Sequence, residues 1–229
     1  MTGSGDPSYP QSEGGKPVAL EARAEAGDGR RQAPSAARNR DPIRDVFAAE
    51  GLGRGRVLEI ASGTGEHGAY LTEAFPDLVW TYSDIDPAGR ASQTAWRAAA
   101  GHDRLAGPLP IDAASDDWGA AEGQDWDLIV SVNMIHISPF AATEGLLRGA
   151  GRLLKPGGHL FLYGPYARNG EIAPSNAAFS ENLKSRDPAW GVRDLDRDLV
   201  PAAAQHGLTL KDVIAMPANN FSVIFERSA

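Results

Sequence analysis

Residues 57–68 read Val-Leu-Glu-Ile-Ala-Ser-Gly-Thr-Gly-Glu-His-Gly. Four residues suited to a buried strand lead into three glycines, and a helical pattern begins at Glu66, so the stretch predicts a strand, a tight turn and a helix. Glycine suits this turn because positive φ and the absence of Cβ let the backbone approach a ligand closely. The first turn of the helix also offers N–H groups without helical partners. We therefore expect a turn that cradles a nucleotide-like ligand.

Two acids, Glu59 and Glu66, bracket this turn and restrict the ligand. A pyrophosphate at the helix N-terminus would face the negative charge of Glu66, which opposes the field that dinucleotide sites use. S-adenosylmethionine carries a sulfonium and an ammonium group and no phosphate, so it fits an acid-lined turn better than NAD. We predict that Glu59, Ala61, Gly63 and Gly65 bind this cofactor. The alternative is an ordinary strand-to-helix turn with surface acids, since the glycine pattern alone is a weak signal.

Composition limits the function. The chain has 229 residues, a formal net charge of −8 and no cysteine. This length allows one full α/β domain. The net negative charge and the absence of a cluster of basic residues argue against nucleic-acid and anionic-membrane partners. The lack of cysteine excludes disulfides and thiolate sites. Neither a metal-ligand spacing, a membrane span nor a signal pattern is found. We expect a soluble, cytoplasmic protein without a metal that acts on a small molecule.

The first 34 residues differ from the rest. They are rich in Gly, Pro, Ser and Ala, and apart from Met1 their only aliphatic residues larger than alanine are Val18 and Leu20. Such a segment cannot bury enough apolar area to offset its ordering entropy. We predict a disordered extension over residues 1–34 and a single domain over residues 35–229.

The opening helix of that domain is expected to start at Pro42, with Asp41 as its N-cap, because aspartate followed by proline is a good helix start. Asn39 comes just before it. It either folds over a cofactor cleft and contacts the substrate or lies in a solvated loop.

Acids follow the next two predicted strands. Asp84 ends the strand over residues 78–83, 21 residues after Gly63, where it is placed to accept both ribose hydroxyl protons, and Ile85 can cover one face of an adenine. Asp112 and Ala113 follow the strand over residues 105–111, where they can accept from the adenine amine and leave room for the ring. For Asp112 the alternative is a loop cap.

The fourth predicted strand, residues 127–132, runs into Asn133 and His136. Open α/β sheets bind ligands at the carboxyl ends of central strands, so we place Asn133 at the cofactor. His136 is the best candidate for a general base, although a histidine between two isoleucines can equally be a satisfied core residue. Tyr163, at the end of the next predicted strand (159–163), is a second catalytic candidate.

Helices separate these strands, which predicts a parallel, doubly wound sheet. Two further strands, near residues 209–216 and 222–225, are joined by only a few residues and should therefore be antiparallel neighbours. The result is a Rossmann-like α/β fold with seven strands, mostly parallel. Four residues in the late loops should overhang the acceptor pocket or else fix those loops: Tyr166, Asn176, Trp190 and Asn220.

Assembled in this order, residues 35–229 resemble the class I S-adenosylmethionine-dependent methyltransferases. The motifs that carry the resemblance are Glu59 to Gly65, Asp84, Asp112, Asp127 to Met134, and Leu154 to Gly158. More narrowly, the chain resembles the family called domain of unknown function 938, or methyltransferase-like protein 26. That resemblance rests on the strings at residues 37–43, 58–67, 83–86, 133–137, 163–166, 174–176, 187–194 and 216–220.

The resemblance implies S-adenosylmethionine as cofactor and names no acceptor. Methyl transfer is an in-line displacement at the sulfonium carbon, so the protein chiefly has to hold a nucleophile in line with it. We therefore predict a small-molecule methyltransferase. Two alternatives stay open: a cofactor-binding regulatory or scaffold protein without turnover, and an NAD(P)-dependent oxidoreductase, against which Glu66 and the final strand pair argue.

Overall fold

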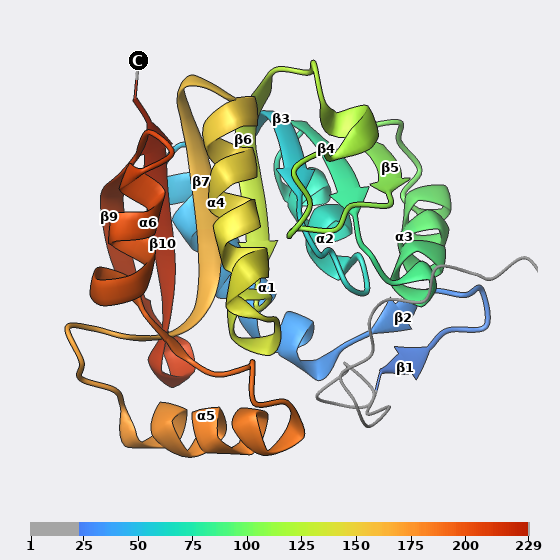
Figure 1. The fold of residues 1–229 in the computed structure, drawn as a ribbon. Helices are drawn as coiled ribbons and strands as arrows, with labels where there is room; N and C mark the ends of the chain where they lie inside the picture. Colours follow the sequence, from blue (N-terminus) through green and yellow to red (C-terminus); the bar gives the residue numbers. More distant parts are fainter. Residues whose placement is uncertain (1–22, 229) are drawn as a thin grey trace, which may run out of the picture.

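The computed structural model describes residues 23–228 and contains one large mixed sheet. Its strand order is β5-β4-β3-β6-β7-β10-β9, and a short β8 pairs with β7 (Figure 1). The strands are β3 (Arg54–Glu59), β4 (Asp77–Ser83), β5 (Leu105–Leu109), β6 (Trp126–Val132), β7 (Leu154–Ala167), β8 (Arg193–Asp194), β9 (Leu208–Met216) and β10 (Asn220–Arg227).

Strands β3 to β7 of this sheet pair in parallel, whereas β10 is antiparallel to both β7 and β9. The predicted α/β fold, with its mostly parallel sheet and antiparallel final pair, is confirmed. One boundary differs. We expected a loop to begin at Gly164, but β7 continues to Ala167, because Asn220 of β10 pairs with Pro165 and β8 pairs with Tyr166 and Ala167.

The helices cover both faces of the sheet. They are α1 (Pro34–Ala49), α2 (Glu66–Ala74), α3 (Pro87–Ala99), α4 (Phe140–Leu153), α5 (Pro174–Arg186) and α6 (Val200–Ala204), with short irregular helices η1 (Gly119–Ala121), η2 (Ile135–Ile137), η3 (Leu195–Leu199) and η4 (Pro217–Asn219). Figure 1 shows α4 and α6 on one face and α1 and α2 on the other. The Asp86 carboxylate caps α3 by accepting the Ala88 N–H at 3.0 Å.

The start of α1 was predicted wrongly. The helix begins at Pro34, eight residues before the expected start, and Pro42 lies inside it. Pro34 already supplies the preset φ of a first helical residue. Asp41 is therefore not the N-cap; its carboxylate accepts hydrogen bonds from Tyr70 and Arg44 instead.

Two apolar cores flank the sheet. Trp118 and Trp126 lie in the core on the α4 side of the sheet, with 2% and 1% of their surfaces exposed. On the other face Phe47 of α1 packs edge-on against Phe161 of β7 and beside Trp80 of β4. At roughly 25 cal/mol per Å² of apolar surface, burial of these large rings contributes much of the stability that fixes the strand ends.

The N-terminal segment is partly ordered. Residues 24–32 form a hairpin of β1 (Ala24–Glu25) and β2 (Arg31–Gln32), although we expected disorder up to residue 34. Its composition could not indicate this order, because the hairpin is held by contacts with α3 rather than by a core of its own. The expected disorder of residues 1–22 lies outside the described residues.

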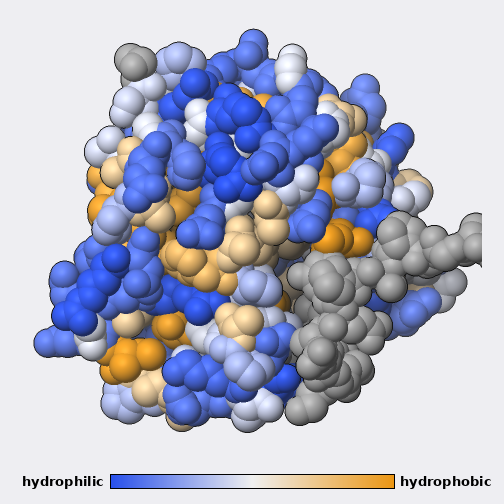
Figure 2. Space-filling view, viewed as in Figure 1, coloured by the Kyte–Doolittle hydropathy of each residue, from blue (hydrophilic) through white to orange (hydrophobic). Residues whose placement is uncertain are grey.

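Hydrophilic residues cover most of the face shown in Figure 2, and apolar colour appears there in separate patches. Val79 and Ile172, at 41% and 37% exposure, are the large hydrophobic side chains exposed among residues 23–228. Within the same residues, none of the helices combines the length and the hydropathy that crossing a bilayer requires.

Candidate functional site

The candidate site lies at the carboxyl ends of β3, β4 and β6. Strand β3 has β4 on one side and β6 on the other, so the chain order reverses here, and open α/β sheets bind their ligands at such a point. Both strands that flank this point continue into a left-handed residue that is not glycine, Ala61 (φ 59°) after β3 and Asn133 (φ 60°) after β6. Such residues are uncommon and concentrate at functional sites.

The glycine turn, residues 61–65, follows β3 as predicted and leads into α2. Gly63 and Gly65 have φ of 57° and 91°. A Cβ on Gly65 would lie 3.2 Å from the Cα of Gln93, so α3 packs closely on this position. A Cβ on Gly63 would meet no described atom within 4 Å. The turn is thus packed on one side and open at Gly63, where a ligand can approach the backbone.

Asp84 lies at this turn, as its position in the sequence suggested. Its Oδ2 accepts the Gly63 N–H at 2.8 Å and its Oδ1 accepts the Asp86 N–H at 2.9 Å. Burial raises the pKa of the Asp84 carboxyl, and the two N–H groups oppose that rise. The carboxylate therefore connects the ends of β3 and β4 beside the open face of Gly63.

Glu59 and Glu66 do not present their charges to a ligand in the way that the sequence argument assumed. The Glu59 side chain is buried and accepts the Trp80 Nε1–H at 3.0 Å. Burial raises its pKa to about 8, so its carboxyl is mostly protonated at pH 7. Glu66 is 6% exposed, and its Oε2 accepts the Ala33 N–H at 2.6 Å and the Thr64 hydroxyl at 3.0 Å.

The three residues expected beside an adenine lie on two separate loops. Ile85 is half-buried after β4. Asp112 is exposed and its Oδ1 accepts the Ala114 N–H at 2.9 Å, the geometry of the loop cap that was the alternative to adenine binding. Ala113 is 8% exposed, and its carbonyl oxygen lies 2.0 Å from where a Cβ on Gly145 would be. Close packing of α4 therefore fixes this loop.

Asn133 and His136 follow β6 beside the end of β7. The Asn133 N–H donates to the Tyr163 carbonyl at 2.8 Å. The His136 ring is 4% exposed, contacts Phe179 of α5 edge-on at 5.6 Å, and lies 3.3 Å from where a Cβ on Gly164 would be. Burial, together with the positive charge of Arg193, lowers the His136 pKa to about 3, so the imidazole is neutral at pH 7.

The remaining acceptor-side candidates fall into two groups. Three are fixed by polar contacts: Asn39 Oδ1 with His67 Nε2 at 2.8 Å, the Asn176 amide with the Asn219 carbonyl at 2.8 Å, and the Asn220 amide with the Pro217 carbonyl at 3.0 Å. Burial raises the pKa of the Tyr163 hydroxyl, and Asn220 and Arg38 oppose that rise. Tyr163 and Asn220 are thus brought together.

Tyr166 and Trp190 are buried, at 4% and 8% exposure. We expected Tyr166 to overhang the acceptor, but its ring packs in the core under α4, because β7 extends through this residue and turns its side chain inward. The sequence reasoning missed Thr64, which lies within the glycine turn, and Ser92 and Ala33, which are connected to the turn by hydrogen bonds. No local pattern marks them, since their contacts join segments far apart in the chain.

The fold identifies the structural class to which the protein belongs. The sheet order and the layers are those of the class I S-adenosylmethionine-dependent methyltransferases, and solved structures match it. The apo form of the S-adenosylmethionine-dependent methyltransferase SibL matches with a TM-score of 0.67 and 20% identity, over 85% of this chain and 57% of its own. An O-methyltransferase family protein from Burkholderia thailandensis matches with a TM-score of 0.68 and 20% identity, over 85% and 58%.

A candidate sarcosine dimethylglycine methyltransferase from Galdieria sulphuraria matches with a TM-score of 0.68 and 14% identity, over 90% of this chain and 92% of its own. The chain spans less than two thirds of the length of SibL and of the Burkholderia protein, and at these identities the matches establish the fold. Residues 30–227 match the family described as "protein of unknown function (DUF938)", and the chain belongs to that family.

Proposed function

We propose that this protein is an S-adenosylmethionine-dependent methyltransferase that acts on a small molecule. The observation that carries the proposal is the bond from the Gly63 N–H to Asp84 Oδ2, 2.8 Å, at the point where the strand order reverses. It joins a glycine turn with an open face to a carboxylate at the tip of the next strand. The methyltransferase fold supports S-adenosylmethionine as the ligand. The net charge of −8 favours a small acceptor over nucleic acid.

The residues present fit an adenosyl ligand. Gly63 leaves room for a ligand beside its backbone, and in the proposed complex Asp84 accepts from the ribose hydroxyls while Ile85 and Ala113 provide apolar surface for the ring. Asn133 follows β6 on the other side of the same crevice. When bound, the cofactor supplies an electrophilic methyl group on a sulfonium. The residues of this chain hold the methyl group and the acceptor's nucleophile in line and exclude water.

His136 is the residue on the acceptor side that is best placed to take a proton. It is a neutral imidazole at pH 7, and its ring is 4% exposed. A neutral imidazole can accept a hydrogen bond from an acceptor hydroxyl or amine and so orient its lone pair. Burial makes His136 a weak base. We therefore propose that it mainly orients the nucleophile and does not fully remove its proton.

The test is calorimetric titration of the purified protein with S-adenosylmethionine, S-adenosylhomocysteine and NAD. We expect micromolar binding of both adenosyl compounds and none of NAD. Asp84→Ala should weaken adenosyl binding about a hundredfold, since it removes two charge-assisted hydrogen bonds and the ribose partner. Asp86→Ala is the matched control, because it removes a neighbouring carboxylate that only caps α3.

Binding of NAD instead, or no adenosyl binding at all, would contradict the proposal. Adenosyl binding without methyl transfer to any of a panel of hydroxyl, amine, thiol and carbon acceptors would favour the non-catalytic regulatory alternative.

A further inference from the structure

The glycine turn is attached to the N-terminal hairpin as well as to the sheet. Residues 30–33, which we call the N-terminal strap, contain β2, lead directly into α1 and pass beside the turn. Glu66 makes the first connection: one carboxylate oxygen accepts the Ala33 N–H at 2.6 Å and the Thr64 hydroxyl at 3.0 Å. Glu66 is 6% exposed; its bond with Thr64 is buried and its bond with Ala33 partly buried, and hydrogen bonds shielded from water contribute more than those at the surface.

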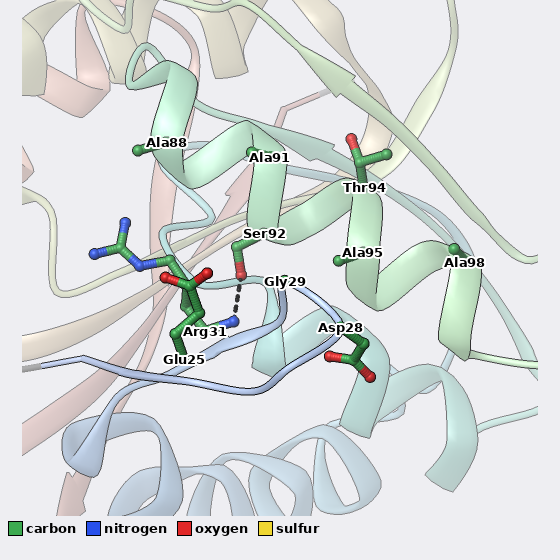
Figure 3. Close-up of a pocket in the computed structure, with 10 residues that line it drawn as sticks. All are labelled: Glu25, Asp28, Gly29, Arg31, Ala88, Ala91, Ser92, Thr94, Ala95 and Ala98. Carbon is green, nitrogen blue, oxygen red and sulfur yellow. Dashed lines mark hydrogen bonds between the residues drawn. The ribbon is translucent and has the colours of Figure 1, made fainter.

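Ser92 of α3 makes a second, independent connection. Its hydroxyl is fully buried, accepts the Arg31 N–H at 2.9 Å and donates to the Thr64 carbonyl at 2.7 Å. Figure 3 shows the bond from Arg31 to Ser92 at one side of a cleft of about 430 Å³ between the hairpin and α3. Thr64 is thus held from two directions, through its hydroxyl by Glu66 and through its carbonyl by Ser92.

Further contacts fix the strap on the same side. The Trp96 Nε1–H donates to the Arg31 carbonyl at 3.1 Å, and the Arg30 guanidinium lies over the Trp96 ring at 4.9 Å. Trp96 Cδ1 is in turn 3.3 Å from where a Cβ on Gly65 would be. The strap, α3 and the turn therefore pack as one unit, and movement of the turn away from the strap would break these partly buried hydrogen bonds.

We infer that Glu66 and Ser92 are positioning residues: through them the N-terminal strap holds the glycine turn in its ligand-binding shape, and the hairpin is part of the cofactor site. This inference rests on the proposed function for its ligand. It also assigns Glu66 a role that differs from the one its charge suggested. Its carboxylate serves as a hydrogen-bond acceptor within the protein, and the ligand does not depend on its negative charge.

The test compares Glu66→Ala, Glu66→Gln and Ser92→Ala with the wild-type chain. Thr72→Ala is the control, because Thr72 is buried in α2 and donates to the Gly68 carbonyl at 2.7 Å, so its loss removes a similar bond away from the turn. Hydrogen exchange of the peptide covering residues 60–65 is measured on the ligand-free proteins. Binding of S-adenosylhomocysteine is then measured by calorimetry, well below the melting temperature of each variant.

We expect Glu66→Ala and Ser92→Ala to speed exchange of residues 60–65 about tenfold and to weaken S-adenosylhomocysteine binding about tenfold. Glu66→Gln keeps an acceptor oxygen and should stay within about threefold of wild type in both measurements. Thr72→Ala should lower the melting temperature without either change.

Unchanged exchange at residues 60–65 in Glu66→Ala and Ser92→Ala would overturn the inference, whether or not the ligand binds. Equal losses in Glu66→Gln and Glu66→Ala would overturn it too, because charge would then be the contribution of Glu66. If the variants exchange faster but the wild-type chain does not bind S-adenosylhomocysteine, the proposed function is wrong, whereas the inference that Glu66 and Ser92 position the turn still holds.

Discussion

The two halves of the candidate site are built differently. In the cofactor half, at the ends of β3 and β4, buried hydrogen bonds hold the backbone: Asp84 bonds the Gly63 and Asp86 N–H groups, and Ser92 bonds Thr64. In the acceptor half, at the ends of β6 and β7, backbone bonds also occur, from the Asn133 N–H to the Tyr163 carbonyl and from the Gly191 N–H to the His136 carbonyl, but the His136 ring itself rests against Gly164 and Phe179. In the cofactor half, side chains bond the backbone and so fix its shape. In the acceptor half, the His136 ring can be replaced without breaking those backbone bonds.

The largest expected difference between the halves comes from adding one methyl group to each. In Gly68→Ala the new Cβ would lie 2.4 Å from Tyr82 and 2.7 Å from Trp80, both fully buried, so we expect a loss of about 2–3 kcal/mol in the free energy of unfolding. In Gly164→Ala the nearest atoms belong to His136 at 3.3 Å, and the loss should be under about 1 kcal/mol. Urea denaturation measures both, and similar losses would contradict the rigid packing assigned to the cofactor half.

The second prediction uses the buried carboxyl of Glu59. Its pKa is about 8 in the folded chain and 4.5 in the unfolded reference, so the unfolded state releases this proton first as the pH rises. Glu59 therefore lowers stability progressively between these pH values. Glu59→Gln should abolish that decline, and its advantage over wild type should grow by on the order of 2–4 kcal/mol from pH 4.5 to 8.

Denaturation of both proteins at pH 4.5, 6 and 8 checks this prediction. His67 and His136, whose pKa values burial lowers to about 4 and about 3, add a trend of opposite sign, but both proteins share it, so the difference isolates Glu59. A difference that is independent of pH would mean that Glu59 is ionised in the folded chain.

The smallest expected effect concerns the left-handed residues that follow β3 and β6. Ala61 at φ 59° is strained by its methyl group, so Ala61→Gly should stabilise the fold by about 0.5–1 kcal/mol. Asn133 has nearly the same φ, 60°, but asparagine tolerates this region, so Asn133→Gly should change stability by less than about 0.3 kcal/mol. Thermal melts of the two variants measure the contrast, and destabilisation by Ala61→Gly would show that its methyl group is needed for packing.

Sequence reasoning worked where the site depends on strand ends. Gly63 and Asp84 each follow a strand with clear apolar character, and parallel neighbours place such ends side by side, so their meeting was predictable. The bond from Ala33 to Glu66 was not, since it joins a backbone N–H in an Ala- and Gly-rich segment to a residue 33 positions away. Tyr166 was misplaced because the pairing of β8 and β10, rather than local sequence, sets the length of β7. The shifted pKa of Glu59 follows from burial, which sequence does not measure.

The most direct test of the proposed cofactor site is a crystal structure of the protein with S-adenosylhomocysteine. We expect the ribose hydroxyls to lie within hydrogen-bond distance of Asp84, the ligand to pass the open face of Gly63, and Ala33 to stay bonded to Glu66. Binding of the adenosyl group elsewhere, for example in the cleft between the hairpin and α3, would contradict this site.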